Sequence, residues 1–253
     1  MRKNLQILSL IFLCSFSFES PKVKGNAFTV NPVDNEVLVD LHEFAQDSYN
    51  QLGMKNLFFK PYKLALNGYF KMLEAGQLTN TKYLTIVDMT KSANVERMFI
   101  ISTETWQVVH TSLVSHGMKT GEEFAQDFSN LESSHQSSLG FFIANEVYDG
   151  KHDKSLKLDG LEYSNDNARD RGVVVHAADY VSAEYVKSNG RLGRSYGCPA
   201  LPHDGYDQVI DKIKDGSCFF IYYPDKDYMR KSKYANAKIS SKLNCDGQLA
   251  ELK

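Results

Sequence analysis

The sequence predicts a mainly β domain preceded by a short helical segment. Beyond Thr81, apolar residues occur in short aromatic and β-branched runs separated by Gly, Asn, Asp and Ser, which is typical of strands joined by turns. From about Asp40 to Gly76 the apolar residues instead recur at helical spacing. The 253 residues are 42% hydrophobic and 12% aromatic, which is enough for a substantial core.

Two helices are expected in the segment before the strands, in "LHEFAQDSYNQLG" and "PYKLALNGYFKMLEAGQ". In the second, Leu66, Phe70 and Leu73 keep helical spacing. Pro61 suits the first turn of that helix and Gly76 can end it. We expect these helices to form an N-terminal cap on the β domain.

The expected strands lie in seven runs, and one amphipathic helix is expected between the last two of them. That helix is "YDQVIDKIKDG" at 206–216, with Val209, Ile210 and Ile213 on one face and Gly216 at its end. The strand-like runs are "KYLTIVDM", "ERMFIIST", "WQVVHTSLVSHG", "SSLGFFIANEVYDG", "LKLDGLEY", "GVVVHAADYV" and "CFFIYYP".

The N-terminus has the pattern of a secretory signal peptide. Arg2 and Lys3 precede a mostly apolar run, Leu5 to Phe18, which is too short to span a bilayer comfortably. We therefore expect residues 1–20 to be a signal peptide, and the remainder to be exported to the periplasm or cell envelope without stable membrane insertion. No small-x-small cleavage site is visible, so an uncleaved N-terminal anchor stays open as the alternative.

Charge and metal-ligand patterns exclude two classes of function. The net charge is −2, and Lys and Arg are scattered rather than gathered into a basic stripe, so nucleic acid is not an expected partner. There is no C-x-x-C pair and no H-E-x-x-H motif, so no metal site is expected.

Three cysteines remain once Cys14 is assigned to the signal peptide, and an odd number leaves at least one unpaired in an oxidising compartment. Cys218 lies in "SCFFIYYP", which is typical of a buried strand, so we interpret it as a small core residue. Cys245 lies in a polar tail, and whether it pairs with Cys218 stays open.

Cys198 is the candidate nucleophile, in "GRLGRSYGCPALP" at 190–202. A thiol that attacks a carbonyl needs a base for its proton and donors for the oxyanion. His176 ends the strand-like run "GVVVH", and the amides around Tyr196, Gly197 and Cys198 are candidate donors. Spacing alone does not separate this hypothesis from a packed structural thiol.

The stretches "HAADYVSAEYVKSNGRLGRSYGCPALP" and "VSHGMKTGEEFAQDFSNLESSHQSSLGFF" resemble the murein L,D-transpeptidase family, in the branch whose cysteine motif reads S-[WY]-G-C-P-A-L. By this resemblance His176 matches the family's first histidine and Cys198 its nucleophile, while Ser195 and Gly197 match the serine and glycine before it. We therefore expect Cys198, His176 and Ser195 to be catalytic and the backbone at Gly197 to help hold the oxyanion. Tyr196 stands where the wider family has a second histidine, so only its backbone amide is carried over, as an oxyanion donor.

Four further residues are candidates for substrate binding. "SSLGFF" at 137–142, which contains Ser138, resembles the family's cleft-lining T-P-x-G-x-F element. Arg194 precedes the cysteine motif, and its planar guanidinium suits a substrate carboxylate. His116 and His135 lie in polar loops near the expected cleft, where structural hydrogen bonding is the alternative role.

The resemblance implies an L,D-transpeptidase-like β-sandwich or barrel that acts on peptidoglycan stem peptides and needs no cofactor. With the composition of the chain, it gives a helical segment at 21–80, a catalytic domain at 81–230 and a polar tail at 231–253. The implied reaction forms 3→3 cross-links through a thioester on Cys198. An L,D-carboxypeptidase or amidase, and a non-catalytic wall-binding module, stay open as alternatives.

Overall fold

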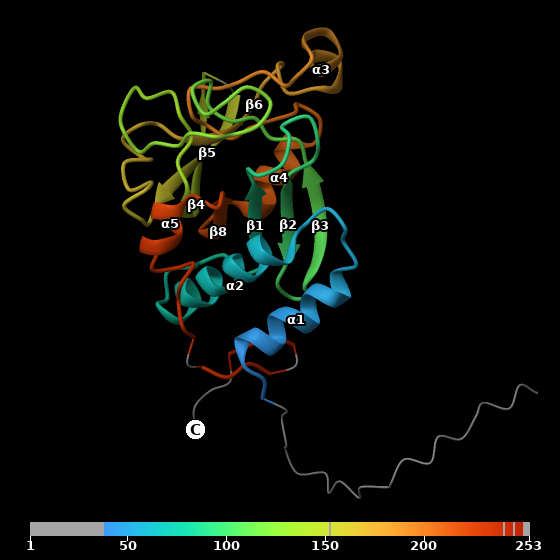
Figure 1. Cartoon of the computed structure of the whole chain (residues 1–253), viewed down its shortest axis with the longest axis vertical. Helices are drawn as coiled ribbons and strands as arrows, with labels where there is room; N and C mark the ends of the chain where they lie inside the picture. The colour runs from blue at the N-terminus through green and yellow to red at the C-terminus, as the bar shows by residue number, and fades with distance from the viewer. Residues whose placement is uncertain (1–37, 152, 240, 245, 250–253) are drawn as a thin grey trace, which may run out of the picture. The chain divides into compact units, whose positions relative to one another are not determined.

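One mixed sheet of eight strands forms the centre of the fold, in the order β3-β2-β1-β8-β4-β5-β6-β7 (Figure 1). The computed structural model describes residues 38–151, 153–239, 241–244 and 246–249. The sheet curls into a nearly closed, barrel-like form. Its strands are β1 Tyr83–Asp88, β2 Met98–Ser102, β3 Gln107–Ser112, β4 Gly140–Gly150, β5 Asp153–Gly160, β6 Val174–Ala177, β7 Ala200–Leu201 and β8 Ser217–Tyr222.

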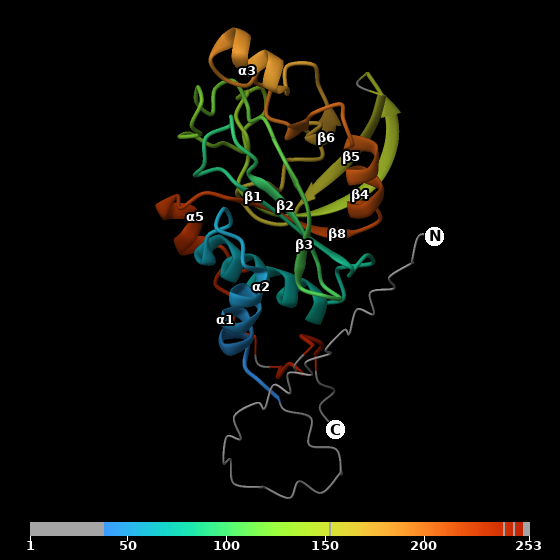
Figure 2. The same cartoon turned by 90° about the vertical axis from the view of Figure 1, so that its right-hand side faces the viewer.

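Helices α1 (Leu41–Leu52) and α2 (Phe59–Glu74) lie together on one side of the sheet (Figure 2). The Asp40 side chain caps α1 by accepting the Glu43 N–H at 2.9 Å. Helix α2 packs closely on β4, because a Cβ added at Gly68 would come within 2.0 Å of the Phe141 ring. The predicted mainly β fold with N-terminal helices is therefore confirmed.

The middle of the sheet consists of apolar strands, as the sequence pattern predicts. Strand β8 is buried along its whole length, between β1, to which it runs parallel, and β4, to which it runs antiparallel. Cys218 on β8 is fully buried and burial raises the pKa of its thiol, which agrees with a core residue. Helix α4 (Tyr206–Ile213) buries Val209, Ile210 and Ile213 as expected.

Three short elements go beyond the sequence-based expectations: α3 (Ala183–Asn189), α5 (Lys226–Lys231) and β7. Helix α3 buries no residue, so it has no apolar stripe to detect. Strand β7 has only two residues, which is too short for an alternating pattern.

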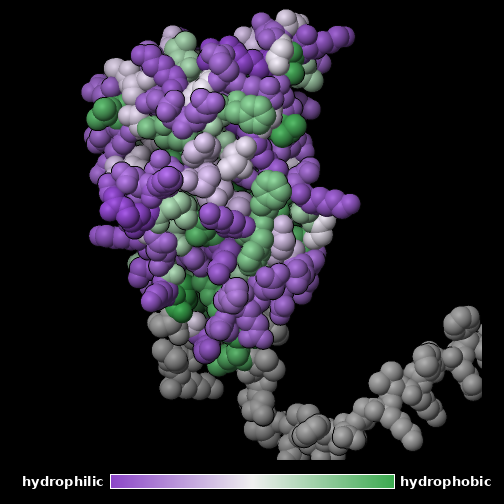
Figure 3. All heavy atoms as spheres, viewed as in Figure 1, coloured by the Kyte–Doolittle hydropathy of each residue, from purple (hydrophilic) through white to green (hydrophobic). Residues whose placement is uncertain are grey.

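The expected signal peptide, Cys14 and Cys245 lie outside the described residues. Among the helices that the structure describes, none is long and apolar enough to cross a membrane. Hydrophilic residues cover most of the face shown in Figure 3.

Candidate active site

Cys198 lies in a tight turn that its own neighbours hold in shape. The Ser195 hydroxyl accepts the Gly197 N–H at 3.0 Å and donates to the Cys198 carbonyl oxygen at 2.6 Å. Gly197 has φ of 131°, and a Cβ at this position would lie 2.8 Å from the Gln136 carbonyl oxygen. Both the backbone angle and the space therefore require glycine here.

The Cys198 thiol lies against the backbone segment that leads into β6. Its S–H donates to the Gly172 carbonyl oxygen at 3.6 Å, and its sulfur accepts the Val174 N–H at 3.5 Å. Burial raises the pKa of the thiol, while the Val174 N–H and the positive charge of Arg171 act in the opposite direction. The thiol is therefore neutral at rest, and an attack by its sulfur would need a base to take the proton.

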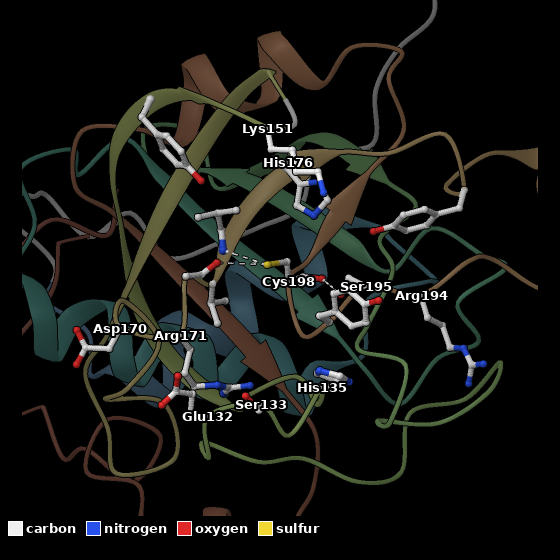
Figure 4. A pocket seen from close by; sticks show the side chains of 16 residues that line it. Glu132, Ser133, His135, Lys151, Asp170, Arg171, His176, Arg194, Ser195 and Cys198 are labelled. Atoms are coloured by element: carbon white, nitrogen blue, oxygen red, sulfur yellow. Dashed lines mark hydrogen bonds between the residues drawn. The ribbon is translucent and has the colours of Figure 1, made fainter.

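His176 lies on β6, and the parallel pairing of β6 with β7 sets it opposite Ala200, two residues beyond Cys198. Its Nδ1 lies 2.8 Å from the Ala177 carbonyl oxygen. A carbonyl only accepts, so Nδ1 carries a proton, and in the neutral form of the imidazole the lone pair is on Nε2. Figure 4 shows the imidazole on the Cys198 side of the pocket.

Both residues line one cavity of about 610 Å³, which is within the usual size range of small-molecule sites. Its walls come from the cysteine turn, the start of β6, the tip of the β4–β5 hairpin and the loop at 132–135. The lining residues are Glu132, Ser133, His135, Tyr148, Lys151, Asp170, Arg171, Gly172, Val173, Val174, His176, Tyr180, Arg194, Ser195, Tyr196 and Cys198.

Arg194 reaches the pocket wall, but Nη1 of its guanidinium is bound to the neighbouring loop. It donates to the carbonyl oxygens of Met118 at 3.0 Å and Gly121 at 2.9 Å. The same Nη1 forms an ion pair of 2.8 Å with Glu122, and this hydrogen bond lowers the pKa of that carboxyl. Binding of a substrate carboxylate by Arg194 stays a prediction, with Glu122 as a competing anion.

His135 and Tyr196 form a pair of rings at the pocket wall, with centroids 4.5 Å apart. Tyr196 is 72% exposed, so its side chain points to solvent while its backbone belongs to the cysteine turn. His135 adopts φ of 55°, a left-handed conformation that is uncommon outside glycine.

His116 and Ser138 do not line this cavity. His116 is buried, its Nδ1 lies 2.8 Å from Nη2 of Arg97, and burial lowers its pKa to about 4. Its carbonyl oxygen accepts the Ser195 N–H at 3.0 Å, so the backbone of His116 stabilises the cysteine turn from outside the cavity. The Ser138 hydroxyl donates to the Ser129 carbonyl oxygen at 2.8 Å.

Three residues of the cavity were not candidates from the sequence: Gly172 and Val174, which contact the thiol, and Arg171. Val174 and His176 are two positions apart on one strand and therefore share a face of the sheet. This spacing could have indicated from the sequence that Val174 lies near the site. Arg171 lies in the charged run "NARDRG", where nothing in the sequence distinguishes it from a solvated residue.

A family model described as an L,D-transpeptidase catalytic domain matches residues 54–222. The chain belongs to this family. L,D-transpeptidases are enzymes that act on peptidoglycan. The match contains the whole cysteine turn, β6 and the 129–138 loop. No group of three or more potential metal ligands occurs among the described residues.

Solved L,D-transpeptidases are only distantly similar to this chain. One from Mycobacterium smegmatis has 15% identity and a TM-score of 0.36 over 56% of this chain and 59% of its own. One from Xylanimonas cellulosilytica has 15% identity and a TM-score of 0.35 over 71% and 93%. A third, solved in complex with imipenem, has 15% identity and a TM-score of 0.34 over 56% and 59%. Among curated proteins, none matches the sequence.

Proposed function

We propose that this protein is an exported murein L,D-transpeptidase that forms 3→3 cross-links through a thioester on Cys198. Family membership supports the reaction class. The observation that carries the assignment to residues is the shared cavity, which brings a cysteine, a histidine and a glycine-containing turn together.

In the first half-reaction, the Cys198 sulfur attacks the carbonyl carbon of the L,D peptide bond after the third residue of a donor tetrapeptide. Because the thiol is neutral at rest, Nε2 of His176 takes its proton as the C–S bond forms. The Ala177 carbonyl holds the imidazole in the tautomer that accepts this proton.

The oxyanion of the tetrahedral intermediate needs backbone donors at the turn. The Gly197 N–H is directed at the Ser195 hydroxyl, so we assign this role to the amides of Tyr196 and Cys198, which flank it. The imidazolium of His176 then protonates the leaving amine, the C–N bond breaks, and terminal D-alanine is released.

In the second half-reaction, the amine of an acceptor stem attacks the thioester. His176 accepts a proton from this amine, and the thiolate leaves and regains a proton. Water in place of the amine would make the protein a carboxypeptidase. Export is part of the proposal because the substrate lies outside the cytoplasm, and the N-terminal sequence pattern supports it.

The test is muropeptide analysis after the purified protein is incubated with a disaccharide tetrapeptide donor, with and without an added acceptor stem. We expect a 3→3 dimer with loss of D-alanine, and no product from Cys198→Ala with an unchanged circular dichroism spectrum. Tripeptide alone would identify a carboxypeptidase, and no turnover by the folded wild type would favour a wall-binding module.

A further inference from the structure

Arg171 is a half-buried cation at the pocket that has no carboxylate partner among the described residues. Its guanidinium donates only to neutral oxygens. Nη1 binds the Ser129 carbonyl oxygen at 2.9 Å and the Ser138 hydroxyl, and Nη2 binds the Ser134 hydroxyl at 3.2 Å and the Gln136 carbonyl oxygen at 2.8 Å. Its charge is therefore oriented but not neutralised.

The position of Arg171 brings this charge to the nucleophile. The next residue, Gly172, accepts the Cys198 S–H, and Val174 donates to the sulfur. On the other side, Nη2 lies 3.3 Å from the place that a Cβ on Gly197 would occupy. The guanidinium thus lies directly against the cysteine turn, from the same segment that contacts the sulfur.

The four hydrogen bonds also hold the charge still. The acceptors of all four belong to residues 129–138, a loop far from Arg171 in the sequence. The side chain therefore cannot move into solvent without breaking these hydrogen bonds. A charge that is shielded from water by such contacts acts on a nearby anion more strongly than an exposed one.

The other positively charged side chains that line the cavity are not both unpaired and shielded from water, as Arg171 is. Arg194 is paired with Glu122, and Lys151 is exposed at the β4–β5 hairpin tip. Burial raises the pKa of Cys198, whereas the Val174 N–H and the positive charge of Arg171 lower it. The remaining groups lining the cavity are Glu132, His135, Tyr148, Asp170, His176, Tyr180 and Tyr196.

We propose that Arg171 is a positioning residue whose fixed, uncompensated positive charge stabilises the Cys198 thiolate while His176 holds the thiol proton. The proposal rests on the proposed function only in taking Cys198 as the nucleophile. It adds a second positive charge, besides the imidazolium, to stabilise the sulfur anion.

The experiment follows the rate at which iodoacetamide alkylates Cys198 in the full chain, from pH 5 to 10, by mass spectrometry of the Cys198 peptide. Arg171→Gln should raise the pH midpoint of alkylation by about one unit, which is about a tenfold slower reaction near pH 7. Arg171→Lys keeps a charge and should restore most of the rate. Arg169→Gln is the matched control, since Arg169 pairs with Glu146 and Asp159 outside the cavity, and its profile should equal the wild type.

A folded Arg171→Gln protein with the wild-type pH midpoint of alkylation would overturn the proposal, even if its turnover is lower. Arg171 would then have only the structural role of holding the 129–138 loop in place. Ser138→Ala removes one of the hydrogen bonds but keeps the charge, so a midpoint raised as far as in Arg171→Gln would also overturn it. If Arg171→Gln does not fold, a midpoint raised by a full unit in Arg171→Lys decides against the proposal. A shifted midpoint in a protein with no transpeptidation would contradict only the proposed function.

Discussion

The Ser195 hydroxyl donates a hydrogen bond of 2.6 Å to the carbonyl oxygen of Cys198. The same oxygen atom of Ser195 accepts the N–H of Gly197 at 3.0 Å, so one side chain orients two peptide groups of the turn, Tyr196–Gly197 and Cys198–Pro199. The peptide group between these two carries the Cys198 N–H, one of the two amides to which we assign the oxyanion. In the proposed reaction the side chain of Ser195 would therefore act through the shape of the turn.

Ser195→Ala should lower kcat/KM by about tenfold to a hundredfold, because the loss of two hydrogen bonds worth about 1–3 kcal/mol lets the turn relax. Steady-state kinetics with the tetrapeptide donor measures this effect. Ser232→Ala is the matched control, since this buried serine also makes hydrogen bonds, to Glu162 and to the Ala235 amide, but lies outside the cavity. It should lose stability and keep its activity; equal losses of activity in both variants would contradict the role of Ser195.

His176→Ala should slow alkylation of Cys198 near neutral pH, since burial already raises the pKa of this thiol and the variant has no imidazole to take its proton. The pH–rate profile of alkylation measures the effect. His135→Ala removes another imidazole from the same cavity and should leave alkylation unchanged. If His135→Ala slows the reaction and His176→Ala does not, the base is His135.

A carbapenem should acylate Cys198, and most penicillins should do so poorly. The strained lactam carbonyl is open to attack by a sulfur beside oxyanion donors, and a cavity of about 610 Å³ has room for a molecule of this size. Intact-protein mass spectrometry should find one adduct on the wild type and none on Cys198→Ser. A protein that transpeptidates but forms no adduct would mean that the cleft, in which Tyr196 stands for the family's second histidine, excludes the drug.

The free energy of unfolding should fall between pH 6.5 and pH 4 in a way that depends on His116. Burial lowers the pKa of His116 in the folded protein from 6.5 to about 4, so in this window the unfolded chain binds more protons than the folded one and acid favours unfolding. The stabilisation is fully present above pH 6.5, and about 3 kcal/mol is lost by pH 4. Urea unfolding of wild type and His116→Gln across this range measures it, and parallel curves would exclude His116 as the source.

Local patterns in the sequence determined most of the regular elements and indicated the two residues of the proposed proton transfer. Helical spacing marked α1 and α2, and aromatic and β-branched runs marked the strands, because each of these elements buries a face that its own neighbours along the chain define. The strand end at His176 was visible for the same reason, whereas the candidate roles of Cys198 and His176 came from the resemblance of their motifs to those of the family. Elements with no buried face or with only two residues, such as α3 and β7, carried no such pattern.

Only the tertiary structure decided which polar residues surround the thiol. It brought Arg171 to the 129–138 loop and to Gly197, and it buried His116 behind the turn instead of in the cavity. It also directed Arg194 to Glu122. A hydrogen bond between residues that are dozens of positions apart depends on how the strands pair and the loops fold back. Periodicity in the sequence shows which face of a helix or strand is buried. It does not show which residues from other parts of the chain pack against that face.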